Sequence, residues 1–169
     1  MALELAYALE LLTRTDVAQG LRLSAQVRVH RLWTVYVGYR FEARVAVDNG
    51  DDSVELQRHP LDAGVRFRWW LGAFELAGQA GLGFSYSRLF QRLPATSSNA
   101  AKTTADWLVF LDAQVHLGVR PLPRLLLFAG VGARFYAKNA RYQFAPDDVL
   151  LAPWPVQPSF RVGLTVDLF

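Results

Sequence analysis

Hydrophobic and polar residues alternate along most of this chain with a period of two. The pattern is clearest in the last eleven residues, SFRVGLTVDLF. There Phe160, Val162, Leu164, Val166 and Leu168 share one parity, and polar residues or glycine occupy the other as far as Asp167. Successive side chains of a β-strand point to opposite faces, so the stretch predicts a strand with one apolar face and one polar face.

The same alternation recurs along the chain, and no segment shows the 3.6-residue spacing of an amphipathic helix. Eight strands are predicted, at residues 3–11, 21–29, 35–47, 61–69, 74–86, 107–119, 125–135 and 159–169. The fourth is expected to begin after Pro60, because proline cannot donate to a strand ladder. Long connections at 13–20, 48–60, 88–104 and 138–157 alternate with short turns at 31–33, 71–73 and 121–123. This rhythm predicts an up-and-down barrel with both termini on the short-turn side.

The two parities separate charged residues from apolar ones. No residue of the apolar parity is charged, whereas the polar parity carries nine arginines, seven carboxylates and no lysine. Arginine is the cation best suited to bidentate pairing with buried carboxylates. The polar parity therefore predicts an ion-pair network of Glu4, Glu10, Arg22, Arg28, Arg40, Glu42, Arg44, Asp62, Arg66, Arg68, Glu75, Asp112, His116, Arg120, Arg134, Arg161 and Asp167.

A soluble barrel with the apolar face inside is the alternative arrangement. The interior of an eight-stranded barrel is only just wide enough to be filled by side chains, and this apolar face is too bulky for it. Glycines such as Gly38, Gly81 and Gly118 lie on the charged parity, where they would make room for long arginines. The polar face is therefore predicted to line the lumen and the apolar face to meet lipid, where only a closed barrel pairs every backbone group.

Aromatic residues fall near the predicted strand ends, as they do in the interfacial girdles of membrane proteins. Trp33, Trp69 and Trp70 flank the short turns. The predicted girdle next to the long loops consists of Phe84, Tyr86, Trp107, Phe135 and Phe160.

Composition is consistent with a single transmembrane β-barrel domain over residues 1–169. Hydrophobic residues make up 52% and charged residues 20%, which excludes a disordered chain, and the absence of cysteine excludes disulfides. The net charge of +3 comes without a run of basic residues, which argues against nucleic-acid binding. The N-terminal stretch lacks the basic region of a signal peptide, so a signal peptide or an upstream domain before Met1 stays an open possibility.

With this pattern the chain resembles the small eight-stranded outer-membrane barrels of OmpA/OmpX-like architecture, over essentially its whole length and by pattern rather than by motif. The resemblance implies a monomer integral to the outer membrane of a Gram-negative type bacterium, surrounded by lipopolysaccharide, with periplasmic termini. Phe169 is similar to the C-terminal aromatic that the barrel-assembly machinery recognises during insertion. However, Phe169 is one residue out of phase with the apolar parity, so either a local shift restores it or Leu168 takes the outward role.

The function expected from these features is a structural, anchoring or surface-binding role with a plugged polar lumen. The first alternative is a small ion or solute pore, which the excess of arginine would bias slightly towards anions. Four inward apolar residues, Leu108, Phe110, Leu126 and Phe128, could line a lateral opening, but packing against the lumen glycines is favoured.

The second alternative, a lipid A-modifying acyltransferase or deacylase, comes from the resemblance. It would need a nucleophile and a base within hydrogen-bond reach. His30 lies at a short turn, His59 in a loop and His116 on the polar parity, and no His-x-Ser pair occurs. The aspartates near Asp52 are more typical of a turn than of a Ca²⁺ site. No catalytic residue, metal site or cofactor is therefore predicted.

Overall fold

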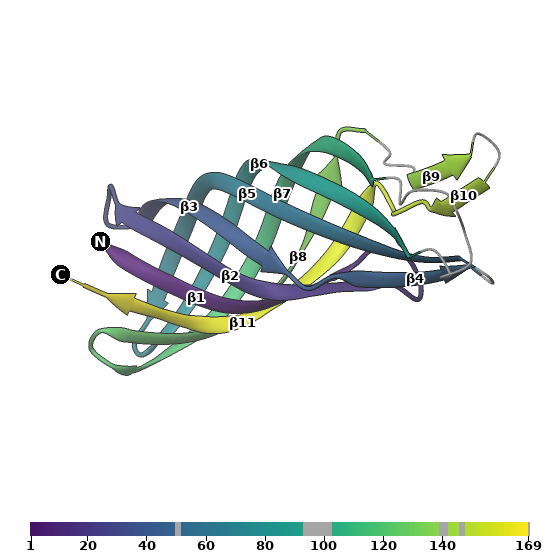
Figure 1. Ribbon diagram of the computed structural model, residues 1–169. Helices are drawn as coiled ribbons and strands as arrows, with labels where there is room; N and C mark the ends of the chain where they lie inside the picture. The colour runs from purple at the N-terminus through teal and green to yellow at the C-terminus, as the bar shows by residue number, and fades with distance from the viewer. Residues whose placement is uncertain (50–51, 93–102, 139–141, 146–147, 169) are drawn as a thin grey trace.

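A computed structural model describes residues 1–49, 52–92, 103–138, 142–145 and 148–168 (Figure 1). Its strands are β1 (Ala2–Leu11), β2 (Val17–Arg28), β3 (Trp33–Glu42), β4 (Val45–Asn49), β5 (Asp52–Leu71), β6 (Phe74–Arg92), β7 (Thr103–Leu122), β8 (Leu125–Tyr136), β9 (Tyr142–Ala145), β10 (Asp148–Leu151) and β11 (Val156–Asp167). The part of the chain that is described holds no helix able to cross a membrane.

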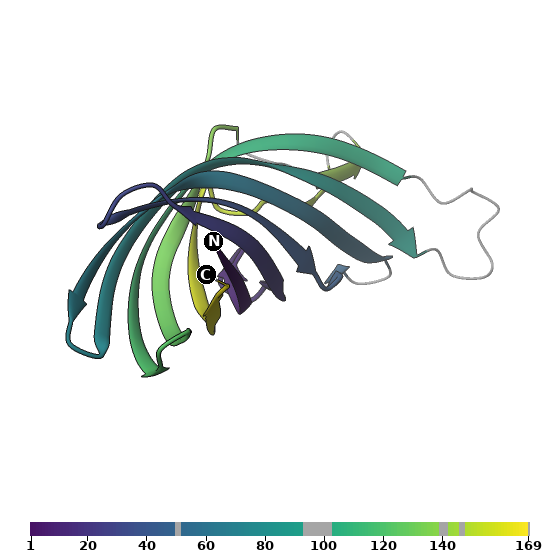
Figure 2. The same cartoon turned by 90° about the vertical axis from the view of Figure 1, so that its left-hand side faces the viewer.

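The main sheet is antiparallel and closes on itself. Its order is β3-β2-β1-β11-β8-β7-β6-β5-β4, and β3 also pairs with β5, which completes the circle. Because β3 and β4 occupy successive stretches of the same edge of β5, the barrel has eight strand positions, as the alternation predicted. The start of β1 and the end of β11 pair side by side at the end of the barrel that carries the short turns (Figures 1 and 2).

The short turns are tight because of their sequence. Leu71 pairs with Phe74, which leaves a two-residue turn whose first residue, Gly72, has a φ of 64°. Two-residue hairpins with glycine at this position match the right-handed twist of the strands that they join. The connection between β1 and β2, predicted to be long at residues 13–20, is also short, because β2 already begins at Val17.

Pro60 lies inside β5 rather than before it, which corrects the predicted start of the fourth strand. The β3–β5 ladder ends at the pair Tyr39↔Leu61, and the β4–β5 ladder resumes at Val45↔Leu56. Pro60 therefore faces the interruption between β3 and β4, where a ladder hydrogen bond from its nitrogen is not required. The same interruption divides the predicted third strand, 35–47, into two elements.

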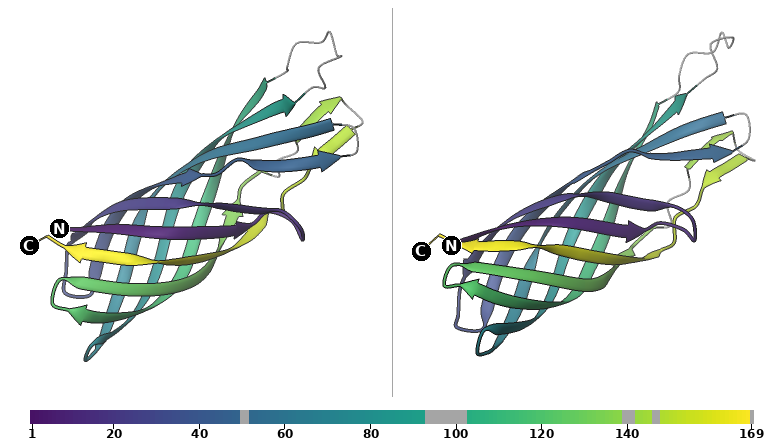
Figure 3. Two further views of the ribbon diagram at one scale, coloured as in Figure 1. Left: turned by 60° about the horizontal axis from the view of Figure 1, so that its bottom comes forward. Right: turned by 90° about the horizontal axis from the view of Figure 1, so that it is seen from below.

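Three strands are much longer than the rest. β5, β6 and β7 have 20, 19 and 20 residues, whereas β1 and β3 have 10 and β2, β8 and β11 have 12. The additional residues continue beyond the barrel at the long-loop end, where β4 pairs with β5 (Figures 1 and 3). We call β4 and the outer parts of β5, β6 and β7 the projecting sheet. These strands include most of the predicted loop 48–60 and both ends of the predicted loop 88–104, whose residues 93–102 lie outside the described part of the chain.

Exposure alternates along the barrel strands and places the apolar parity outside. In β2 every second residue from Ala18 to Gln26 is buried, and the intervening residues are exposed. Val115, Val131 and Val162 on the outer face are 52%, 56% and 56% exposed. The interior holds charged and amide side chains instead. This is the reverse of a water-soluble protein, whose interior is apolar.

Candidate functional site

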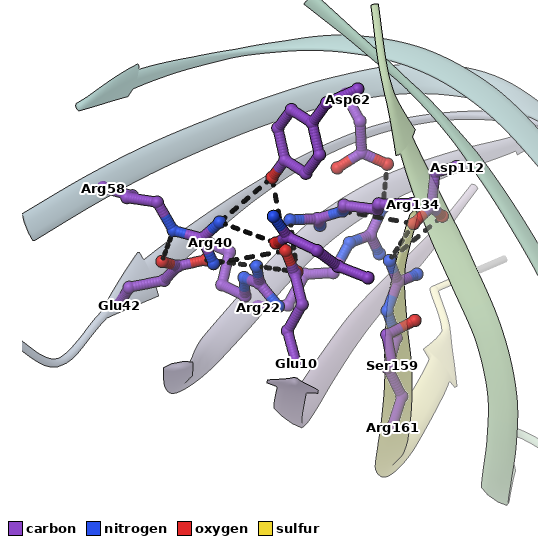
Figure 4. A network of polar contacts seen from close by, with 12 residues as sticks. Glu10, Arg22, Arg40, Glu42, Arg58, Asp62, Asp112, Arg134, Ser159 and Arg161 are labelled. Carbon is purple, nitrogen blue, oxygen red and sulfur yellow. Dashed lines mark hydrogen bonds and ion pairs between the residues drawn. The ribbon is translucent and has the colours of Figure 1, made fainter. Parts of the chain in front are cut away.

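The candidate site is the lumen, where inward side chains meet in two hydrogen-bonded clusters. The outer cluster, nearer the long-loop end, is centred on Glu10 of β1 (Figure 4). Its carboxylate accepts hydrogen bonds from Arg134 of β8 at 2.8 Å, from Arg58 of β5 at 3.2 Å and from Arg40 of β3. The hydroxyl of Tyr136 donates a fourth, at 3.2 Å. Three guanidinium groups from three strands thus converge on one carboxylate that is 0% exposed.

Arg58 has four partners in the outer cluster, as many as Glu10. Its Nε donates to Glu42 at 2.8 Å, and its Nη1 donates to Tyr136 and Gln157 at 3.1 and 3.0 Å. Glu42 is the last residue of β3, so its bond to Arg58 ties β3 to β5 within the interruption near Pro60. Arg40 of β3 also pairs with Glu42.

Arg134 extends the outer cluster to Asp112, its register partner on the neighbouring strand β7. Its Nη1 donates to Glu10 and its Nε donates to Asp112 at 3.2 Å. Arg161 of β11 approaches both oxygens of Asp112 at 3.1 Å. Next to this pair, Gln114 donates to the hydroxyl of Ser159 at 3.0 Å.

The inner cluster, nearer the short-turn end, is centred on Glu4 of β1. Its carboxylate accepts from Arg22 at 2.8 Å, from Arg66 at 2.5 Å and from the Gln26 amide at 2.7 Å. Arg22 also donates to Asp62 at 2.8 Å. Arg66 donates to Gln79 of β6 at 2.8 Å. Between them, the two clusters draw a side chain from every strand position of the barrel.

Charge in the lumen is close to balance. Among the described residues, seven arginines and six carboxylates are buried. Such a set is stable only when each charge is paired, because an isolated buried ion costs several kcal/mol. Some polar atoms keep no protein partner, among them Nε and Nη1 of Arg161 and Nη2 of Arg134. Ordered water is the usual partner of such atoms.

The four inward apolar residues pack inside the lumen. Leu108, Phe110, Leu126 and Phe128 are between 1% and 4% exposed. A Cβ built on Gly118 would lie 2.8 Å from Cδ1 of Leu126, and one built on Gly83 would overlap the ring of Phe110. Glycine at these positions makes room for a large side chain on a neighbouring strand.

The structure places most of the predicted network in the two clusters, but six of its members lie elsewhere. Arg44 is exposed above the barrel and pairs with Glu55 of β5 at 2.8 Å, so its predicted place in the lumen is corrected. Arg28 is also exposed, at the short-turn end. Arg120 and Asp167 pair with each other at 3.0 Å and are only half-buried. The remaining pair, Arg68 with Glu75 at 3.0 Å, is buried near the same end.

Arg58 is the main residue that the sequence analysis missed. It lies before Pro60, where the strand was expected not to have begun. The parity of Arg58 agrees with that of Asp62 and Arg66. Continuing the alternation through the proline would therefore have found it.

Most of the predicted interfacial aromatics lie on the outer face. Phe84, Trp107, Phe135 and Phe160 are 43%, 62%, 42% and 47% exposed, and the ring of Tyr86 lies 4.8 Å from that of Trp107. At the short-turn end, Trp33 and Trp69 are 44% and 54% exposed.

Trp70 differs from the other aromatics. It has the parity of the lumen, and the guanidinium of Arg120 lies 4.4 Å from its ring centroid. Of the predicted assembly signal, Leu168 is 36% exposed, and Phe169 lies outside the described residues.

The histidines have polar or aromatic partners. His116 contacts the Gln114 amide oxygen at 3.1 Å and stacks on Phe128 at 5.2 Å. His59 contacts the hydroxyl of Tyr39 at 2.6 Å. Within the described ranges, no group of three or more potential ligands is placed to hold a metal ion. Asp51, one of the loop aspartates, lies outside those ranges.

Comparison with known proteins identifies the fold. No protein-family model and no curated protein matches the chain. Among solved structures, a major outer membrane protein from Thermus thermophilus is similar with a TM-score of 0.65 and 16% identity, covering 98% of this chain and 99% of that one. Neisserial surface protein A is similar with a TM-score of 0.58 and 16% identity, covering 98% of this chain and 94% of that one. Ail, the attachment invasion locus protein of Yersinia pestis, is similar with a TM-score of 0.53 and 12% identity, covering 98% of this chain and 94% of that one. The chain therefore has the fold of the small eight-stranded outer-membrane barrels, which confirms the predicted architecture.

Proposed function

We propose that this chain is a monomeric outer-membrane barrel whose ion-paired lumen is closed and whose projecting sheet serves a surface-binding or anchoring role. The observation that carries this proposal is the pair of clusters whose side chains cross the lumen. Solved structures of the same fold include proteins named for attachment and for the cell surface, which supports a role on the outside of the cell.

The closure follows from how the ion pairs are connected. Glu10 of β1 is bonded to Arg58 of β5, and these strands are separated by β2 and β3 in the sheet. Glu4 and Arg66 join the same two strands nearer the other end. Side chains therefore cross the bore at two levels. An open path would require several buried pairs to separate together, at a cost of a few kcal/mol each.

The outer face supports the membrane location. Large apolar side chains on it are exposed around the barrel strands, among them Leu23, Val37, Leu82, Leu117 and Val162. Such a continuous apolar surface is expected only where it is covered, and a bilayer would cover it on all sides. In this location the long-loop end would face outwards and the termini would lie in the periplasm. We further propose lipopolysaccharide as the outer surroundings and the barrel-assembly machinery as the partner during insertion.

The projecting sheet is the part best placed to meet a partner. Arginines lie over aromatic rings at this sheet: Arg44, which directly precedes β4, lies 5.0 Å from the ring centroid of Phe90, and Arg88 lies 5.2 Å from that of Tyr86. Arginine and tyrosine are enriched at binding hot spots. A rigid barrel that presents such a surface beyond the membrane suits recognition better than transport.

Conductance in a planar bilayer tests the closed lumen. The protein, refolded into lipid and shown to be folded by its heat-dependent migration on a gel, should produce no steady single-channel conductance in KCl. A channel-forming porin inserted in the same bilayer is the positive control. Steady openings with a preference for chloride would contradict the plug and would favour the small pore, because the buried arginines outnumber the buried carboxylates.

A further inference from the structure

The lumen has a pocket at its short-turn mouth that the two clusters do not fill. Its volume is about 420 Å³, and its lining includes Gln26, Arg28, Thr34, Arg68, Arg120 and Arg124. Gln26 also donates to Glu4, so this lining residue belongs to the inner cluster as well. The pocket therefore borders the inner cluster and lies between it and the short turns.

Positive charge dominates this pocket. Four of its lining residues are arginines, and Asp167 is the carboxylate among the lining residues. Asp167 pairs with Arg120, and Arg68 pairs with Glu75. Arg28 and Arg124 are exposed and have no ion-pair partner among the described residues. The local excess of two positive charges favours an anionic ligand.

Buried polar groups at the pocket also lack partners. Arg68 and Thr34 are each 2% exposed, and neither Nη2 of Arg68 nor Oγ1 of Thr34 has a hydrogen-bond partner. A buried donor without a partner costs about 1–3 kcal/mol. Water or an anion could satisfy these groups, and the surrounding arginines favour the anion.

Arg120 is held in place before any ligand arrives. Its Nη2 donates to Asp167 and its Nη1 to the carbonyl oxygen of Pro123, both at 3.0 Å, and its guanidinium lies over the ring of Trp70. Its Nε keeps no partner. Because the Arg120 side chain is already fixed, it loses little conformational entropy when a ligand binds to it.

We infer that the short-turn mouth is a binding site for a phosphate group. Arginine clusters prefer phosphate because the planar guanidinium donates two parallel hydrogen bonds to its oxygens. The phosphate could belong to a free inorganic ion or to the headgroup of a phospholipid in the adjacent leaflet. The inference does not depend on whether the lumen conducts, since the pocket lies below the inner cluster.

Titration followed by NMR tests this site. The ¹⁵N-labelled protein in a non-ionic, phosphate-free detergent is titrated with inorganic phosphate in one arm and with short-chain phosphatidylglycerol in the other. Ionic strength is held constant with NaCl. The amide signals of Gln26, Thr34 and Arg68 should shift and saturate in at least one arm. Saturation with inorganic phosphate identifies the free ion as a ligand, and saturation only with the lipid identifies the headgroup.

Two variants make the test specific. In the double variant Arg28→Gln/Arg124→Gln the apparent dissociation constant should rise roughly fivefold, because two phosphate-facing cations are lost. Both residues are exposed and unpaired, so the barrel should fold normally, as the gel assay can verify. Arg14→Gln, at an exposed site in the turn between β1 and β2 at the opposite end, is the control and should leave binding unchanged. The inference is overturned if neither titrant shifts these signals, or if the control weakens binding as much as the double variant.

Discussion

Replacing Glu10 by glutamine should lower the free energy of unfolding by about 3–5 kcal/mol, the usual cost of breaking a buried ion pair by removing one partner. Glutamine keeps the shape of the side chain but removes its charge. Arg40, Arg58 and Arg134 would then face one another around a neutral amide. Arg134 would retain Asp112 and Arg58 would retain Glu42, so the loss is large without being complete.

Urea-induced unfolding in lipid vesicles measures this loss. The matched control is Arg44→Gln, which breaks an ion pair above the barrel whose arginine side chain is 56% exposed. Exposed pairs contribute roughly 0–1 kcal/mol, so this variant should unfold near the wild-type midpoint. If Glu10→Gln costs no more than Arg44→Gln, the outer cluster does not hold the barrel together.

Arginine in place of Val131 should lower the free energy of unfolding in vesicles by about 2–4 kcal/mol, as a cation does at the bilayer midplane on a barrel's outer face. Val131 is 56% exposed and lies near the middle of β8. In plain water an exposed strand position would tolerate arginine with little loss. The expected cost therefore arises from hydrocarbon around the barrel.

The control for this variant is the same substitution at a strand end. Val156, at the start of β11, is 44% exposed, and at the membrane interface arginine should cost about 0–1 kcal/mol. Both variants are compared by the same urea titration. Equal losses at the two positions would mean that the middle of β8 is not in hydrocarbon.

The alternation of residues predicted the barrel well because a membrane strand obeys it strictly. In β1, β2, β8 and β11 successive residues point alternately to the lumen and to the outside. A shift of one residue would send every side chain to the wrong face, so the sequence must keep to this alternation. For this reason Glu4, Glu10 and Arg134 could be placed in the lumen from the sequence.

The extent of the strands could not be predicted in the same way. Beyond the membrane no lipid-facing residue is required, so the alternation that marks a spanning strand weakens there. The projecting sheet was consequently expected to be loop. The prediction at Pro60 was wrong for a different reason. Proline interrupts a strand ladder only where the neighbouring strand requires a hydrogen bond from its nitrogen. The break between β3 and β4 leaves no such neighbour next to Pro60.

Partners within the lumen also required the structure. Sequence parity places Glu10 inside but does not show that three arginines converge on it, since Arg40, Arg58 and Arg134 come from strands that are distant in sequence. The pocket at the short-turn mouth could not be predicted either, because its lining residues also come from different strands and turns. Arg28 and Arg120 were predicted members of the ion-pair network, but the structure places them at the mouth, outside the two clusters.

Contacts between side-chain methyl groups and lipid acyl chains test most directly which face of the barrel meets the membrane. Leu126 and Leu127 are adjacent in β8, yet Leu126 is 1% exposed and Leu127 is 43% exposed. In lipid nanodiscs, nuclear Overhauser contacts to acyl-chain protons should appear for Leu127, Val131 and Val162 and be absent for Leu126. Equal contacts at Leu126 and Leu127, or contacts at Leu126 alone, would contradict an apolar exterior around an ion-paired lumen.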